Sequence, residues 1–217
     1  MRLMDHEFRL PGKEARESTL KAVDGLLTLE SLRKVSLPAM KDLDSIFEDR
    51  LSKLDQLEKI TILRGGDLSD RGIASLKNLK KLKSISIDQT KIGDPSLEVI
   101  GQMKQMTDLY LGGHLFTDEG VKHLANLDEL RYLCIDGPPK DVRPTIFAIF
   151  MQPKKELVKG DVTDDGLQEL LQLKKLTYLS VFQTQCSDSM AAKFKACLLY
   201  TSPSPRDLST SRMPSSA

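Results

Sequence analysis

The chain contains a segment of 24 residues that occurs three times in succession. The units begin at Leu68, Ile92 and Phe116, and they read LSDRGIASLKNLKKLKSISIDQTK, IGDPSLEVIGQMKQMTDLYLGGHL and FTDEGVKHLANLDELRYLCIDG. A fixed period of roughly 20 to 50 residues is typical of repeat architectures, in which each unit contacts only its neighbours. The sequence therefore predicts a stacked, elongated fold.

Each unit has two halves with different periodicities. The first half carries apolar residues at helical spacing: Ile73, Leu76, Leu79; Leu97, Ile100, Met103; Val121, Leu124, Leu127. The second half ends in the alternation of a short strand: Leu82, Ile85, Ile87; Met106, Leu109, Leu111; Leu130, Leu133, Ile135. One unit can bury about seven apolar side chains, and each contributes roughly 1.5–3 kcal/mol. Their sum does not offset the cost of ordering the whole unit, which is about 1.5 kcal/mol for every residue. We therefore expect units to stack and share a parallel sheet.

The same pattern extends beyond these three units, with one break in register. Strand-like matches occur earlier, at Val35 and at Ile60, and further units begin at Val162 and Cys186. The step from Phe116 to Val162 is 46 residues, 22 more than the period, and the extra residues fall within 138–161. Two interpretations remain open for 138–161: a loop or hairpin inserted after a strand, which we favour, or an irregular extra repeat without a helix.

The predicted helix starts also repeat. Potential N-cap residues are followed by an aspartate in five units: Ser69-Asp70, Gly93-Asp94, Thr117-Asp118, Thr163-Asp164 and Ser187-Asp188. A side-chain oxygen at the cap accepts from free backbone N–H groups, and the aspartate meets the positive end of the helix dipole. We favour this over metal or acid–base chemistry. Gly72, Gly120 and Gly166 stand two positions after an aspartate, where neighbouring units would approach closely.

Composition excludes several function classes. The formal net charge is +1 and 29% of residues are charged, which argues against binding driven by bulk charge to nucleic acid or membrane. The cluster Lys77, Lys80, Lys81 and Lys83 is interpreted as a solvated convex face. The sequence has no apolar run of the ~20 residues that a membrane helix needs and no recognisable signal peptide, which favours a cytoplasmic location.

Cysteine and histidine spacing indicates no catalytic or metal site. Cys134 and Cys186 are too few for a disulfide framework, and His6, His114 and His123 show no metal-ligand spacing. No nucleophile–base set stands out. We therefore expect a protein that is not an enzyme and needs no cofactor.

The two ends of the chain differ from the repeats. Residues 1–18 are polar and of mixed charge, and we expect a leader or the start of an N-terminal cap, followed by a repeat domain over 19–196. Residues 197–217 read CLLYTSPSPRDLSTSRMPSSA. This stretch resembles the translation of a DNA sequencing adapter, which would make it a disordered, artefactual tail.

The repeats resemble the leucine-rich repeat family. The similarity is to its 24-residue, bacterial-type class, related to ribonuclease-inhibitor-like repeats, with a (Ser/Thr)-Asp-x-Gly-Leu helix start. It covers 68–135 and 162–194 well and 26–67 loosely. The resemblance implies a right-handed α/β solenoid with a parallel sheet on the concave face and helices on the convex face. It also implies protein binding through the concave face.

On that fold, the residues between the strand leucines face the concave side. They are Lys34, Ser36, Lys59, Thr61, Ser84, Ser86, Asp88, Asp108, Tyr110, Tyr132, Cys134, Asp136, Tyr178, Ser180 and Phe182. Tyrosine suits a half-wet contact surface, and aromatic anchors are common at the centres of interfaces. The alternative is that these rings only pack across strands. The predicted partner-binding residues are Tyr110, Tyr132, Tyr178, Phe182, Asp88, Asp108 and Asp136.

The main hypothesis is thus an interaction module that binds a protein or peptide, with no nucleic-acid or membrane partner. A second hypothesis is a recognition fragment of a larger enzyme or ligase adaptor whose catalytic domain lies outside this frame. A third is a structural spacer. The sequence does not indicate an oligomeric state.

Overall fold

The computed structural model describes residues 7–9, 25, 32–38, 42–63, 66–88, 90–112, 116–136, 162–181 and 184–197. Within them, strands and helices alternate as the repeat predicts. The strands are β1 (Glu7–Arg9), β2 (Lys34–Pro38), β3 (Lys59–Leu63), β4 (Ser84–Asp88), β5 (Asp108–Gly112), β6 (Tyr132–Asp136) and β7 (Tyr178–Ser180). The α-helices are α2 (Leu43–Asp49), α3 (Asp70–Ala74), α4 (Asp94–Gly101), α5 (Asp118–His123), α7 (Asp164–Gln168) and α8 (Asp188–Cys197).

Each helix is short because the chain must return to the sheet within one period. Four helices pass into a 3₁₀ turn before the next strand. These turns are Leu51–Lys53, Ser75–Asn78, Leu124–Asn126 and Glu169–Gln172. The tighter 3₁₀ geometry suits such short terminal segments.

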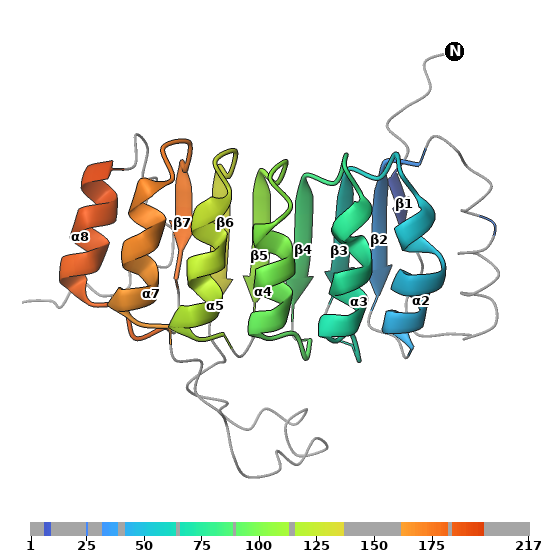
Figure 1. Cartoon of the computed structure of the whole chain (residues 1–217), viewed down its shortest axis with the longest axis horizontal. Coiled ribbons are helices and arrows are strands. Elements are labelled where there is room, and N and C mark those ends of the chain that lie inside the picture. Colours follow the sequence, from blue (N-terminus) through green and yellow to red (C-terminus); the bar gives the residue numbers. More distant parts are fainter. Residues whose placement is uncertain are drawn as a thin grey trace, which may run out of the picture.

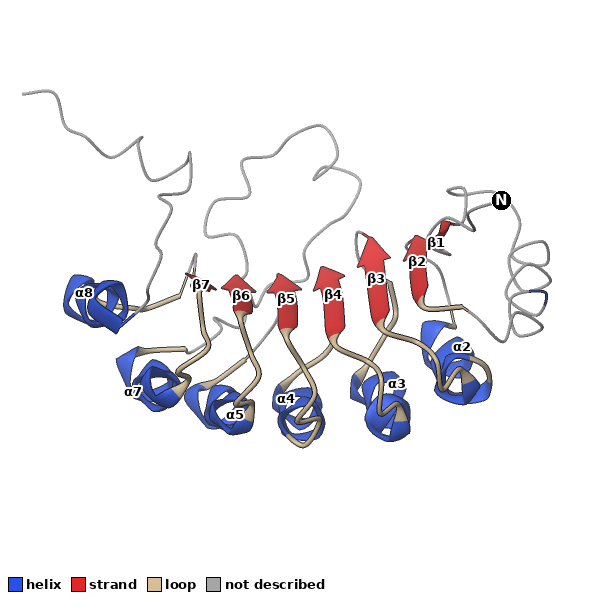
Figure 2. Ribbon diagram, turned by 90° about the horizontal axis from the view of Figure 1, so that it is seen from above, coloured by secondary structure: helices blue, strands red, loops and turns tan. Residues whose placement is uncertain are grey.

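The described strands form one parallel sheet in the order β1 to β7, with the helices along one side (Figure 1). Figure 2 shows the arrangement as a shallow arc, with strands on the inner side and helices on the outer side. The predicted register is confirmed, since Ile85 pairs with Leu109, Leu109 with Leu133, and Leu133 with Leu179. The fold is therefore the expected α/β solenoid of leucine-rich repeat type.

The core lies between the sheet and the helices. Alternate strand residues point into it, and Ile85, Leu109 and Leu133 are at most 1% exposed. On the helix side, Ile73, Leu97 and Val121 are fully buried. Cys186 occupies an apolar core position, as predicted, and is partly buried against the same cluster.

One backbone hydrogen-bond pattern marks the start of each strand from β3 to β7. The Lys83 carbonyl accepts from the N–H groups of Thr107 and Asp108 at 2.8 and 3.1 Å. The Arg131 carbonyl accepts in the same way from Thr177 and Tyr178, at 2.8 and 3.0 Å. Adjacent units are thus joined identically on both sides of the irregular segment.

The irregular segment leaves the sheet continuous. β6 pairs directly with β7, so no other strand lies between them in this sheet. Residues 137–161 are outside the described residues, and the choice between an insertion and an irregular repeat stays a prediction. Residues 198–217 are also outside them, so the assignment of the tail stays a prediction as well. β1 pairs with β2 from Glu7 to Arg9, and the repeat pattern gave no sign of this strand.

The first-turn aspartates join neighbouring units along one edge of the solenoid. Asp94 accepts from the Thr117 N–H at 2.9 Å and from its hydroxyl at 2.6 Å. Asp118 accepts from the Thr163 N–H and hydroxyl, both at 2.7 Å. Asp44 and Asp164 bind Ser69 and Ser187 in the same way. We call Asp44, Asp70, Asp94, Asp118 and Asp164 the aspartate ladder.

The ladder corrects the capping prediction. Ser69 and Thr117 make no side-chain cap bond to their own helices. Their hydroxyls donate to the aspartate of the preceding unit, a charged acceptor that forms a strong hydrogen bond and sets the direction of the hydroxyl. Only Thr163 and Ser187 also accept from their own helix, each at 3.2 Å, from the N–H groups of Asp165 and Met190. The repeated hydroxyl is therefore mainly a link between units.

Asp70 accepts the same two kinds of hydrogen bond as the other ladder aspartates, although the residues that donate them differ. Its neighbour Gly93 has no hydroxyl, but the Gly93 N–H still donates at 2.8 Å. The missing hydroxyl comes from Ser96, whose Oγ lies 2.6 Å from Asp70 Oδ1. In three other units the position of Ser96 is a glycine, and the position of Gly93 is Ser or Thr: Ser69 with Gly72, Thr117 with Gly120, and Thr163 with Gly166.

The repeated glycines make room for the ladder, as predicted. A Cβ on Gly120 would lie 2.1 Å from Asp94 Oδ1, and one on Gly166 would lie 2.4 Å from Asp118 Oδ1. At Gly72 the corresponding distance to Asp44 Oδ1 is 2.6 Å. These positions need glycine because the aspartate of the preceding unit occupies the space of a side chain.

Candidate functional site

Strand pairing sets the concave side chains into rows that cross the sheet. The first row consists of Lys34, Lys59, Ser84, Asp108, Tyr132 and Tyr178. The second row consists of Ser36, Thr61, Ser86, Tyr110, Cys134 and Ser180. Because strands lie about 4.8 Å apart, neighbours within a row are close enough to contact one partner together.

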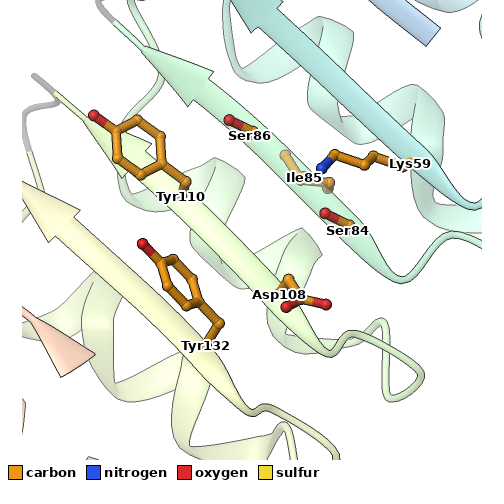
Figure 3. Close-up of a pocket in the computed structure, with 7 residues that line it drawn as sticks. All are labelled: Lys59, Ser84, Ile85, Ser86, Asp108, Tyr110 and Tyr132. Atoms are coloured by element: carbon orange, nitrogen blue, oxygen red, sulfur yellow. The ribbon is translucent and has the colours of Figure 1, made fainter. Parts of the chain in front are cut away.

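A groove of about 440 Å³ lies over the middle of these rows. Its walls come from β3 to β6: Lys59, Ser84, Ile85, Ser86, Asp108, Tyr110 and Tyr132. Figure 3 shows Tyr110 and Tyr132 rising from adjacent strands on the same side of the sheet as Lys59. The groove is therefore lined by two aromatic rings, by serine and tyrosine hydroxyl groups, and by one positively and one negatively charged side chain.

The tyrosine rings of β6 and β7 are stacked. The centroids of Tyr132 and Tyr178 lie 4.4 Å apart and their planes differ by 1°. Both side chains are half-buried. Cross-strand packing, the alternative considered for these rings, thus does occur. The stack also holds the Tyr132 ring at the edge of the groove. Packing between the strands is therefore compatible with a role of this ring in contacts with a ligand.

A glycine shapes the other end of β5. A Cβ on Gly112 would lie 2.8 Å from Asp88 Oδ1 and 3.1 Å from Tyr110 Oη. The Asp88 carboxylate and the Tyr110 hydroxyl therefore converge over Gly112, in space that any larger residue would fill. This convergence directs Tyr110 along its strand.

The charges of the groove are separated. Lys59 and Asp108 are both exposed and lie two strands apart. The Thr107 hydroxyl donates to Asp108 Oδ2 at 2.6 Å. Within the described part of the chain, neither Lys59 nor Asp108 has an ion-pair partner. Each charge is available to a ligand.

The structure brings together three of the predicted binding residues, Asp108, Tyr110 and Tyr132, in one groove. Tyr178 does not line the groove but stacks on Tyr132, which does. The Asp88 carboxylate lies near the Tyr110 hydroxyl, over Gly112. Asp136 pairs with Gly112 in the sheet, but its side chain and all of Phe182 lie outside the described residues. The predicted set omitted Lys59, Ser84 and Ser86, although the register already placed them on the concave side.

The described residues include acidic side chains, a histidine and cysteines, which are residue types that can bind metal ions. They contain no group of three or more His, Cys, Asp or Glu side chains placed to hold a metal ion. Burial raises the pKa of the Cys186 thiol, and the nearby Asp164 carboxylate raises it further. Cys134 and Cys186 are both free thiols. Among the described helices, none has the length and apolarity to cross a membrane.

No protein-family model matches the sequence, and no curated protein is similar to it. Among solved structures, the C-terminal domain of a Caenorhabditis elegans tropomodulin is similar over 82% of this chain and 90% of its own length. The TM-score is 0.44 and the identity 13%. An internalin from Listeria monocytogenes is similar over 82% of this chain and 70% of its own, with a TM-score of 0.35 and 16% identity. These identities are too low to relate individual side chains.

Proposed function

We propose that the chain is a non-catalytic module that binds a protein or peptide segment on its concave face. The observation that carries the proposal is the groove over β3 to β6, which is lined by Tyr110, Tyr132, Asp108 and Lys59. The other side of the described sheet is filled by the core, so a partner that contacts these strands through their side chains does so on the concave side.

The size of the face fits an extended segment. The first row crosses β2 to β7, which is about 24 Å at ~4.8 Å per strand. An extended chain covers that distance with about seven residues at ~3.3 Å each. The hydroxyl and charged groups of the two rows can pair with backbone and polar groups of such a segment.

The tyrosines give the face its anchoring surface. Each ring offers a large apolar area with a polar tip and loses little rotamer entropy. Tyr132 loses even less because Tyr178 already holds its ring. Rigid aromatic side chains at the centre of a contact are typical sites of binding energy.

A phage-displayed peptide library panned against the full chain tests the proposal. We expect enriched peptides that bind wild type, and loss of their binding in the Tyr110→Ala, Tyr132→Ala, Tyr178→Ala triple variant. Circular dichroism should be unchanged. The matched control is Lys77→Ala with Lys80→Ala, two exposed residues on the helix side. Peptides that bind the triple variant as well as wild type would refute the concave face as the site.

A further inference from the structure

The groove has opposite charges at its two ends. Lys59 on β3 forms one end and Asp108 on β5 the other, with Ser84 and Ser86 of β4 between them. Two strand spacings separate the two charged residues, about 10 Å. A ligand that satisfies both therefore carries an anionic and a cationic group at a similar separation.

The Tyr132 ring forms a platform at the acidic end. Tyr178 covers one face of this ring. Asp108 is the neighbour of Tyr132 on the opposite side in the row, and the groove contacts Tyr132 but not Tyr178. The Tyr132 ring thus lines the groove beside a carboxylate, on the side away from Tyr178. An aromatic face next to a carboxylate attracts a cation by both its quadrupole and its charge.

The planar shape of the platform favours a guanidinium over an ammonium. A guanidinium stacks on an aromatic face and still presents N–H groups at its edge to a carboxylate. The Asp108 carboxylate accepts one bond from Thr107, which leaves lone pairs for further donors. A lysine ammonium, which is a compact and strongly hydrated charge, would use the ring less well.

We propose that the groove binds an arginine side chain of an extended partner segment, on Tyr132 and Asp108, with an acidic side chain of the same segment on Lys59. The two partner residues lie about two to four positions apart, given ~3.3 Å per extended residue and the reach of the long side chains. This proposal rests on the proposed function and specifies the chemistry of the partner.

An immobilised positional-scanning library of hexapeptides, probed with the labelled full chain, tests the proposal. Wild type should select arginine, with Asp or Glu two to four positions away. Asp108→Asn should lose the arginine preference, and Lys59→Gln the acidic preference. Asp128→Asn and Lys80→Gln change the same charges at exposed positions outside the groove, and both should keep the wild-type selection.

Fluorescence polarisation with the best hexapeptide sharpens the result. Replacement of its arginine by citrulline keeps the shape and removes the charge, and should weaken binding to wild type about tenfold. The same replacement should change binding to Asp108→Asn by less than about threefold, because the carboxylate that reads the charge is gone. Replacement by lysine should give an intermediate loss.

Three outcomes would overturn the proposal: no retained hexapeptide, retained hexapeptides without arginine, or an equal citrulline effect in wild type and Asp108→Asn. Hexapeptides that lack arginine but fail to bind Tyr132→Ala would overturn only this assignment. The concave face would then still be the binding site, and the proposed function would stand.

Discussion

The aspartate ladder and the first concave row occupy equivalent places in successive units, yet their sequences behave in opposite ways. In the ladder the same residue type recurs in every unit from Asp44 to Asp164. The first row instead changes its chemistry along the stack, from Lys34 and Lys59 through Ser84 and Asp108 to Tyr132 and Tyr178. Both are polar and both run the length of the stack.

This contrast distinguishes polar residues that hold the fold together from polar residues that the fold does not require. A ladder aspartate always faces a backbone N–H at the equivalent position and a hydroxyl of the next unit, so its chemistry is fixed by the stack. The sheet places no such demand on a concave side chain, because strand pairing uses backbone groups only. Uniform polar residues in this solenoid hold units together, and varied ones are free to serve a partner. The following predictions test that division, beginning with the largest expected effect.

Gly120→Ala should destabilise the chain most. The new Cβ would lie 2.1 Å from Asp94 Oδ1 and displace that carboxylate from Thr117. Overpacking costs about 1–3 kcal/mol, and disruption of the charged hydrogen bonds adds to it, so we expect about 3 kcal/mol or more in urea unfolding. Gly25→Ala is the control, since nothing lies within 4 Å of its Cβ position. Equal stability of the two variants would contradict the close approach.

Asp118→Asn tests whether the ladder carries stability across the irregular segment. The change removes the charge and one of the two acceptors that face Thr163. We expect a loss of about 2 kcal/mol in the free energy of unfolding. Asp128→Asn, the same change at an exposed position in the turn before β6, should stay within ~0.5 kcal/mol. If both variants unfold at the same urea concentration, the ladder is not a structural element at this junction.

Ser96→Gly should cost about 1.5 kcal/mol, since Asp70 loses a hydroxyl donor at a fully buried position. Adding Gly93→Ser should restore most of that loss, because it moves the hydroxyl to its position in the other units. Gly93 already has the extended backbone of Ser69, so serine fits there. A double-mutant cycle by chemical unfolding measures the coupling. Additive effects of the two changes would mean that the hydroxyls are not interchangeable.

Tyr178→Ala should lower the stability of the fold less than the ladder substitutions do. It should weaken peptide binding more than they do. It removes one stacked ring, worth about 0.5–1.5 kcal/mol, and leaves the Tyr132 ring, which lines the groove, without its stacking partner Tyr178. Thermal unfolding gives the first quantity, and polarisation with a library-derived peptide gives the second. If Tyr178→Ala strongly lowers stability but leaves peptide binding intact, the concave tyrosines have a structural role, like the aspartate ladder.

The smallest effect concerns pH. The Ser187 hydroxyl and N–H hold the pKa of Asp164 below its ordinary value of 3.8. A carboxyl whose folded pKa is depressed adds stability above its unfolded pKa and loses it as the pH falls through the folded pKa. The free energy of unfolding should therefore decline below about pH 4, and less steeply in Asp164→Asn. Because Asp164 is solvent-exposed, the difference will be small. Parallel slopes for the two proteins would exclude a contribution from this bond.

Several features were predictable because they follow from periodicity. The spacing of Ile85, Leu109, Leu133 and Leu179 specified parallel strands in one register, and the glycine positions specified close approach. Asp108, Tyr110 and Tyr132 could be placed on one face by alternation alone. The role of the repeated hydroxyls was assigned wrongly, because local capping and a bond to the next unit use the same residue types. Asp44 was missed because its unit departs from the repeat.

The sequence by itself determined that units of this length must stack, since one unit buries too little apolar surface to fold alone. It also determined which side chains lie on which side of each strand, because that alternation is a local property of the backbone. Only the tertiary structure decided which partners those side chains have. The aspartates turned to the next unit, Ser96 replaced the hydroxyl missing at Gly93, and Tyr178 stacked on Tyr132 across the irregular segment. Such contacts depend on distances between residues from 23 to 46 positions apart, and the packing of whole units sets those distances.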